Sequence, residues 1–184
     1  MVVMSVTAQN KGTFTDSRNN KVYKTIVIGT QKWMAENMNY KTDNSWCYDD
    51  TAINCETYGR LYDWEAAKKA CPTGWHLPSN DEWVTLINYL GGKDVAGDML
   101  KSNIYWYNPK AGVTATSGFE AFPGGIRRLN ASYVDMRAYG YWWSSTEVDA
   151  NNANYVGMEH LNKKAYNDES NKKDGYSVRC LIDK

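Results

Sequence analysis

Four cysteines at uneven spacing are the feature that most limits what this chain can fold into. Cys47, Cys55, Cys71 and Cys180 form no Cys-x-x-Cys pair, so the spacing favours neither a zinc ribbon nor a thioredoxin-type redox site. An even number of cysteines is typical of disulfides, which persist in oxidising compartments. The sequence therefore predicts two disulfides in a secreted, periplasmic or cell-surface protein, although four cysteines allow three pairings.

Chain length and charge balance narrow the architecture and the partners. A chain of 184 residues is long enough to bury one core. Its 21 basic and 21 acidic residues cancel, so no net charge favours nucleic acid or an anionic membrane as partner, and no stretch approaches the length of a transmembrane helix. We expect a single domain over residues 14–184, after a lead-in over residues 1–13 whose apolar start resembles the end of a signal peptide.

Hydrophobic periodicity predicts a mixed α+β domain. Ser79 and Glu82 have the spacing of a capping box at the start of a helix. The predicted helices cover residues 61–71, 79–90 and 94–101. The predicted strands cover residues 22–28, 33–38, 119–127, 141–145, 154–160 and 176–182, the first two joined as a hairpin at Gly29. Residues 10–20, 41–58 and 162–174 are expected to be polar loops and turns.

These elements favour one cysteine pairing over the other two. A bridge from Cys71 to Cys180 would tie the end of the first helix to the last strand. Closing a loop of roughly 100 residues stabilises a fold by about 4 to 5 kcal/mol in the chain-entropy model. A bridge from Cys47 to Cys55 would hold only the local loop over residues 41–58. We regard this pairing as the most economical of the three.

Five short blocks place tryptophan and cysteine at fixed offsets. They are residues 29–37 (GTQKWMAEN), 58–64 (YGRLYDW), 71–79 (CPTGWHLPS), 142–146 (WWSST) and 175–180 (GYSVRC). In this order they resemble the Fibrobacter succinogenes major paralogous domain over nearly the whole chain, residues 14–183. That family occurs in secreted or surface proteins of Bacteroidetes and Fibrobacteres. The resemblance implies a C-type-lectin-like fold, with two main helices packed on short antiparallel sheets and long irregular loops.

The same resemblance limits the chemistry to be expected. Calcium-dependent lectins carry Glu-Pro-Asn or Gln-Pro-Asp and Trp-Asn-Asp triplets, none of which occurs here. Formylglycine-generating enzymes, which share the fold, use reactive cysteines, whereas all four cysteines here are expected in disulfides. Glu147 and Asp149 are the oxygen donors that a calcium ion would use, but a solvated acidic loop is the favoured interpretation. His76 is expected to be a hydrogen-bonded structural residue. We predict no catalytic residue and no cofactor.

Tyrosine and tryptophan supply nearly all of the aromatic surface, with 14 Tyr and 8 Trp against 3 Phe. Such rings suit sites where one end is buried and the other meets water or a ligand. Trp106, Trp142 and Trp143 are assigned to the core. The predicted ligand-binding residues are Tyr105, Tyr107, Tyr139, Tyr141, Asn151, Asn152, Asn154 and Tyr155. Their rings would stack on a sugar or peptide, and their amides would donate and accept hydrogen bonds.

The leading hypothesis is therefore a noncatalytic recognition domain that binds a glycan or an extracellular protein through these C-terminal loops. One alternative is a hypervariable-type protein-interaction domain, in which differences between paralogues would be confined to residues 147–172. The other is an enzyme of the formylglycine-generating or glycan-hydrolase type. A free-thiol count tests the first kind of enzyme, because a reactive Cys71 or Cys180 would overturn the disulfide assignment.

Overall fold

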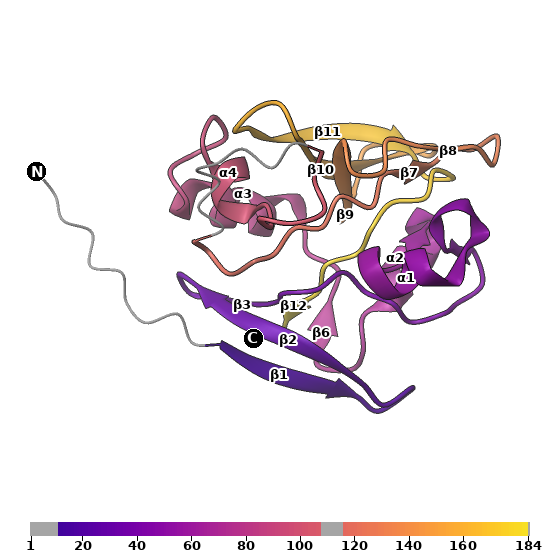
Figure 1. Ribbon diagram of the computed structural model, residues 1–184, viewed down its shortest axis with the longest axis horizontal. Helices are drawn as coiled ribbons and strands as arrows, with labels where there is room; N and C mark the ends of the chain where they lie inside the picture. The colour runs from indigo at the N-terminus through magenta and orange to yellow at the C-terminus, as the bar shows by residue number, and fades with distance from the viewer. Residues whose placement is uncertain (1–10, 108–115, 184) are drawn as a thin grey trace, which may run out of the picture.

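The computed structural model describes residues 11–107 and 116–183. It is an α+β fold that combines short helices with several small antiparallel sheets (Figure 1). The strands are β1 (Lys11–Asp16), β2 (Lys21–Ile28), β3 (Gln31–Met34), β4 (Ser45–Trp46), β5 (Leu61–Tyr62), β6 (Trp75–His76), β7 (Ile126–Arg127), β8 (Tyr133–Val134), β9 (Tyr139–Glu147), β10 (Asn152–Glu159), β11 (Ala165–Asn171) and β12 (Leu181–Ile182). The helices are α1 (Ala52–Tyr58), α2 (Trp64–Ala70), α3 (Asn80–Tyr89) and α4 (Ala96–Leu100), with a 3₁₀ turn over Tyr48–Asp50. The predicted remnant of a signal peptide lies largely outside the described residues.

The largest sheet joins the two ends of the described chain in the order β1-β2-β3-β12-β6. The predicted β2–β3 hairpin forms and turns at Gly29, but Ile28 pairs with Gln31, so β3 starts before the predicted strand over residues 33–38 and ends at Met34. The prediction of a polar loop over residues 10–20 is wrong, because β1 pairs with β2 there. Most β1 side chains are exposed on this edge strand, so the alternation that marks a half-buried strand is missing.

The predicted helices are confirmed in shortened form. Asp63 begins α2 by accepting a hydrogen bond from the Ala66 N–H at 2.8 Å. Ser79 and Glu82 form the predicted capping box at the start of α3. The prediction for residues 41–58 missed α1, a helix of seven residues. Its sequence has too few apolar residues to show a helical period over so short a span.

Both disulfides have the predicted pairing. Cys71–Cys180 joins the end of α2 to the residue just before β12, across 109 positions of the chain. Cys47–Cys55 links the segment before the 3₁₀ turn to α1, across eight positions. The first bridge therefore holds distant parts of the fold together, and the second holds one surface loop. Structural disulfides of this kind are typical of oxidising compartments.

A second sheet of order β11-β10-β9 lies opposite the first, with α3 and α4 beside it (Figure 1). β11 falls in residues 162–174, which we predicted to be turns, because its mostly polar, exposed side chains carry no strand signal. The long strands predicted over residues 119–127 and 176–182 are wrong except for β7 and β12, two residues each. Residues 176–180 are buried, and isolated bridges such as Trp142 with Ser177 join this segment to neighbouring ones.

Adjacent tryptophans of β9 enter different parts of the core. Trp142 packs in a cluster with Trp33 of β3 and Trp83 of α3. Trp143 packs in a different cluster, which contains Trp64 of α2. The Trp142 indole donates to Asn37 Oδ1 and the Trp143 indole to the Tyr62 carbonyl. Trp106 is buried as well, so the assignment of these three indoles to the core is confirmed.

A buried arginine ties three separate segments together. The Arg179 side chain is fully buried, and its guanidinium donates to the carbonyls of Met34, Phe119 and Glu120 and to Asn37 Oδ1. Burial lowers its pKa to about 9.

No helix of the described ranges is long and apolar enough to cross a membrane.

Candidate functional site

One face of the second sheet carries a ladder of tyrosines. The register pairs Tyr141 with Gly157 and Gly157 with Tyr166, and it pairs Tyr155 with Trp143, so these side chains share a face. We call this cluster the tyrosine ladder; it consists of Tyr139, Tyr141, Tyr155, Tyr166 and Tyr176. The Tyr139 and Tyr141 rings are parallel with centroids 5.8 Å apart, and the Tyr141 and Tyr176 centroids are 5.1 Å apart.

The inner and outer parts of the ladder differ in exposure. Tyr155 and Tyr176 are buried, whereas Tyr139, Tyr141 and Tyr166 are half-buried. The prediction that Tyr155 offers its ring to a ligand is therefore wrong, because the ring packs against those of both Tyr141 and Tyr176, with centroids 5.6 and 4.9 Å away. The predicted contact residues Tyr139 and Tyr141 do present part of their rings to solvent.

Carboxylates surround the phenols of the ladder. The Tyr141 hydroxyl donates to Asp135 Oδ2 at 3.2 Å, and burial followed by the Asp135 charge raises the Tyr141 pKa. The charge of Glu159 raises the pKa of Tyr139. Burial, with a smaller effect from Asp168, raises the pKa of Tyr155 to about 12. These phenols therefore stay protonated at neutral pH and can donate hydrogen bonds.

A second group of tyrosines adjoins the ladder through Asp135. We call it the tyrosine patch; it consists of Tyr48, Tyr58, Tyr105, Tyr107 and Tyr133. Its ring centroids lie close: Tyr48 to Tyr133 at 5.2 Å and Tyr58 to Tyr105 at 5.5 Å. The Asp135 charge contributes to raising the pKa of Tyr48, after burial. Tyr105 and Tyr107 are 39% and 47% exposed, so both predicted residues offer ring surface to a ligand.

Backbone strain marks the segments that present the patch. Tyr105, Asp135 and Arg137 have φ values of 73°, 70° and 68°, a region in which residues other than glycine are uncommon. The Tyr107 N–H donates to the Arg137 carbonyl at 2.8 Å, and Arg137 Nε donates to the Tyr105 carbonyl at 3.1 Å. The Arg137 guanidinium also lies 4.8 Å from the Tyr107 ring centroid. These contacts hold two strained segments against each other, an arrangement often found at binding sites.

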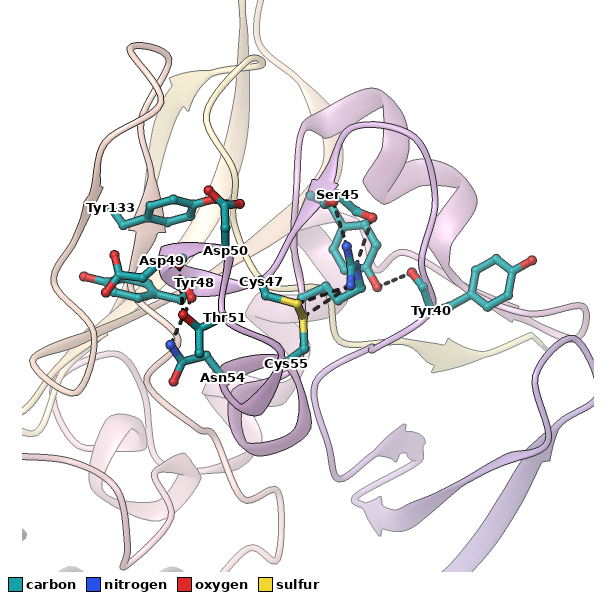
Figure 2. Close-up of a disulfide and its surroundings, with 12 residues drawn as sticks. Tyr40, Ser45, Cys47, Tyr48, Asp49, Asp50, Thr51, Asn54, Cys55 and Tyr133 are labelled. Atoms are coloured by element: carbon teal, nitrogen blue, oxygen red, sulfur yellow. Dashed lines mark hydrogen bonds between the residues drawn. A yellow bond between two sulfur atoms is a disulfide. The ribbon is translucent and has the colours of Figure 1, made fainter.

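The small disulfide supports the other side of the patch. Figure 2 shows Tyr133 beside Tyr48, with the Tyr133 hydroxyl donating to Asp50 Oδ1 at 2.7 Å. Arg60 braces the bridge: its Nη1 lies 3.4 Å from Cys47 Sγ and 3.3 Å from Cys55 Sγ. Because Cys47 precedes the 3₁₀ turn directly, the bridge fixes the turn that carries Tyr48 and Asp50.

The predicted asparagines lie at the opposite end of the β9–β10 hairpin. β9 spans nine residues, so its ends are roughly 26 Å apart at a rise of about 3.3 Å per residue. Tyr139 pairs with Glu159 at one end, and Asn152 begins β10 at the other. The structure therefore separates the predicted site into two regions. We call residues 149–152 the asparagine turn.

Local hydrogen bonds occupy the polar groups of the asparagine turn. Asp149 Oδ1 accepts from the N–H groups of Asn151 and Asn152, and its Oδ2 accepts from the Asn152 side chain at 3.0 Å. The Asn154 side chain lies 3.5 Å from the Thr146 carbonyl. Asn151 alone of these asparagines is fully at the surface. The turn satisfies its own groups and has few left for a ligand.

The Lys172 ammonium contacts Glu147 and Asp149, the two residues considered as calcium ligands. Lys172 Nζ donates to Glu147 Oε1 and to the carbonyls of Asp149 at 2.6 Å and Ala150 at 3.2 Å. The Lys172 ammonium thus pairs with the Glu147 carboxylate, while the Asp149 carboxylate is hydrogen-bonded to Asn151 and Asn152. Among the described residues, no group of three or more His, Cys, Asp or Glu side chains could hold a metal ion.

His76 is hydrogen-bonded on both ring nitrogens, as predicted for a structural residue. Nδ1 lies 2.7 Å from Asp183 Oδ1, and Nε2 lies 3.1 Å from both oxygens of Glu82. Because Glu82 also closes the capping box of α3, the imidazole links that helix to the end of the chain. Its contacts join β6, α3 and the residue after β12, which is a bracing role.

An open pocket lies next to the β7–β8 hairpin. It has a volume of about 460 Å³ and is lined by Ile126, Arg128, Leu129, Asn130, Asn171 and Asp174. None of the predicted ligand-binding residues lines it. The hydrogen bond from the Leu129 N–H to Asp174 Oδ1 shapes its wall.

Sequence reasoning missed several residues in the tyrosine patch and around it. Tyr48, Asp50 and Tyr133 come together only in the folded chain, because 83 positions separate Asp50 from Tyr133. The one local signal was a tyrosine followed by two aspartates between paired cysteines. Arg137 carried no signal, since its importance depends on a backbone conformation and on a contact with Tyr107.

Comparison with known proteins identifies one relationship. A family model described as the Fibrobacter succinogenes major domain matches residues 26–181, most of the chain and all five sequence blocks. No curated protein matches, and no solved structure matches.

Proposed function

The chain belongs to the Fibrobacter succinogenes major domain family, and we propose that it is a noncatalytic recognition domain, secreted or held at the cell surface. It binds a glycan or an extracellular protein through the tyrosine patch and the outer part of the tyrosine ladder. The C-type-lectin-like fold that the sequence resemblance implies is part of this proposal. Small helices between short antiparallel sheets support that fold, and the two disulfides support an oxidising compartment.

The observation that most supports the proposal is that the exposed Tyr105 and Tyr107 rings are carried by a backbone segment that hydrogen bonds hold in an unfavourable conformation. Non-glycine residues with positive φ cost roughly 1–2 kcal/mol each, and Tyr105 and Arg137 both have such values. The Tyr105 and Tyr107 rings remain 39% and 47% exposed on this segment. Rigid tyrosines give a large contact area at a low entropic cost on binding, as in antibody paratopes.

The experiment is an array of glycans and extracellular proteins probed with the purified domain, in calcium and again in chelator. We expect specific signals that Tyr105→Ala with Tyr107→Ala reduces by roughly 30-fold or more, since two anchoring rings contribute about 1–2 kcal/mol each. Thermal unfolding verifies that this variant is folded. Signals that persist in chelator would agree with the Lys172 contacts at the acidic loop.

A matched control variant changes the asparagine turn instead. Asn151→Ala with Asn152→Ala removes two side chains of the originally predicted set, and we expect array signals within about twofold of the unchanged protein. Equal losses in both variants, or a loss confined to the turn variant, would overturn the assignment of binding to the tyrosines. Turnover of an arrayed ligand would favour an enzyme.

A further inference from the structure

The tyrosine-bearing face of the second sheet is buried at its centre, at Tyr155 and Gly157, and partly exposed around it. The register places Glu159, Gly157 and Tyr155 along β10, and on either side of Gly157 it places Tyr141 and Tyr166. A side chain at Gly157 would lie only 2.5 Å from the Tyr166 ring, so this ring lies directly over the bare backbone of β10. The partly exposed surface therefore consists of the Tyr139, Tyr141 and Tyr166 rings, with Glu159 paired to Tyr139 at one end of the hairpin.

The charges that border these rings have one sign. Asp135 accepts a hydrogen bond from Tyr141, Glu159 faces Tyr139, and exposed Asp168 follows Tyr166 on the same face of β11. The nearby cations are directed elsewhere. The Arg137 guanidinium covers Tyr107, and buried Lys101 Nζ donates to the backbone carbonyls of Glu159 and Asn162.

We propose that the outer tyrosine ladder binds a basic segment of a protein ligand, with a lysine or arginine side chain placed between the rings and the carboxylates of Asp135 and Glu159. This inference rests on the proposed function and narrows its ligand from a glycan or protein to a protein of stated chemistry. Charge complementarity carries it: the face offers ring surfaces and carboxylates. A cation over an aromatic face is attracted electrostatically by the ring, most strongly where it is desolvated.

The phenols add a second reason to expect a cation. The ladder phenols whose pKa values are raised remain neutral at pH 7, so the carboxylates determine the charge of this face. A neutral sugar gains no such attraction, and an anionic one is repelled. A basic side chain also has an aliphatic stem that can cover the rings while its charged end reaches the carboxylates.

The test is titration of the whole domain with hexalysine amide, with hexaglutamate as the anionic control, followed by calorimetry at about 0.05 M and 0.3 M salt. We expect binding of hexalysine alone, weaker at high salt. Asp135→Asn with Glu159→Gln should weaken it roughly tenfold, because each lost charge contact weakens binding about threefold. These substitutions keep the side-chain shapes, and asparagine tolerates the positive φ at position 135.

Two further variants keep the result interpretable. Asp43→Asn with Asp81→Asn removes the same charge from exposed positions elsewhere and should change the affinity less than twofold. Tyr139→Leu with Tyr166→Leu keeps the carboxylates and should weaken binding roughly fivefold through the lost rings. Equal losses in both charge variants, or no loss in the leucine variant, would reveal nonspecific charge attraction and overturn the inference.

The two proposals fail in different ways. If hexalysine does not bind while array signals still depend on Tyr105 and Tyr107, the cationic ligand is wrong and recognition by the patch stands. If array signals come only from neutral glycans and depend on Tyr139, the ladder binds sugars instead. If neither the array nor hexalysine responds to any tyrosine variant, both proposals are wrong.

Discussion

The two ends of the β9–β10 hairpin use polar residues in opposite ways. At the asparagine turn, Asp149 accepts hydrogen bonds from its own loop, and Lys172 donates to the Asp149 carbonyl from the turn after β11, so the polar groups hold the asparagine turn in place. At the other end, hydrogen bonds hold the backbone of Tyr105 and Arg137 in strained conformations, and the rings stay outside. One end uses its side chains to build the loop, whereas the other uses its backbone to present side chains.

This difference explains why composition suggested a single binding site across both ends. Asparagine, aspartate and tyrosine are enriched both in ligand sites and in turns. What separates the two regions is whether their donors and acceptors are already used within the loop. Asp149 makes three hydrogen bonds to two neighbours, while Tyr105 and Tyr107 make ring contacts and keep a large exposed surface.

Removal of the small disulfide is expected to have the largest effect, and only on the aromatic end. Cys47→Ala with Cys55→Ala frees the turn that carries Tyr48 and Asp50. A closed loop of about nine residues contributes roughly 2.5 kcal/mol in the chain-entropy model, and binding of an array ligand should fall about tenfold as the patch loosens. Urea unfolding and calorimetry measure the two effects. Unchanged binding in the folded variant would show that the loop is not part of the site.

Substitution of the strained arginine should separate stability from binding. Arg137→Gly relieves a positive φ worth roughly 1–2 kcal/mol and loses a hydrogen bond and a ring contact of similar size. We therefore expect a free energy of unfolding within about 1 kcal/mol of the unchanged protein, but array binding about fivefold weaker. A large loss of stability with intact binding would assign Arg137 a purely structural role.

Acidification should weaken the asparagine turn. Hydrogen bonds from the Asn151 N–H, then from Asn152, hold the pKa of Asp149 below its ordinary value. Because the folded pKa is depressed, this stabilisation is complete above the ordinary aspartate pKa and is lost as the pH falls through the folded value. Asp149→Asn should remove that contribution.

The measurement is urea unfolding of both proteins from pH 7 down to about pH 2. The stability difference between them should shrink as the pH falls, and ligand binding at pH 7 should be the same. A difference that does not depend on pH would show that the Asp149 charge does not hold the turn.

Local signals and chain closure made much of the fold predictable. The Ser79–Glu82 box and the turn at Gly29 are encoded within a few residues, and the Cys71–Cys180 bridge followed from its place between two elements. The edge strands β1 and β11 were not predictable by the same means. Their outward side chains are polar, so they lack the alternation produced by a half-buried strand.

Of the candidate site, only the exposed tyrosines could be predicted from the sequence. Tyr105, Tyr107 and Tyr139 were recognisable from their composition, because rings with polar ends favour partly exposed positions. The burial of Tyr155 and the strained conformation of Arg137 depend on contacts across the folded chain. Such contacts have no signature in a single sequence, and neither does the local hydrogen bonding that occupies the asparagine turn.

The most direct test of the contrast between the two ends is chemical-shift mapping of the labelled domain with hexalysine amide and with any array ligand. We expect ligand-dependent shifts in residues 105–107 and 133–141 and at position 166, with residues 149–152 unchanged. Shifts centred on residues 149–152, with the tyrosine segments unaffected, would contradict the account and place recognition at the asparagine turn.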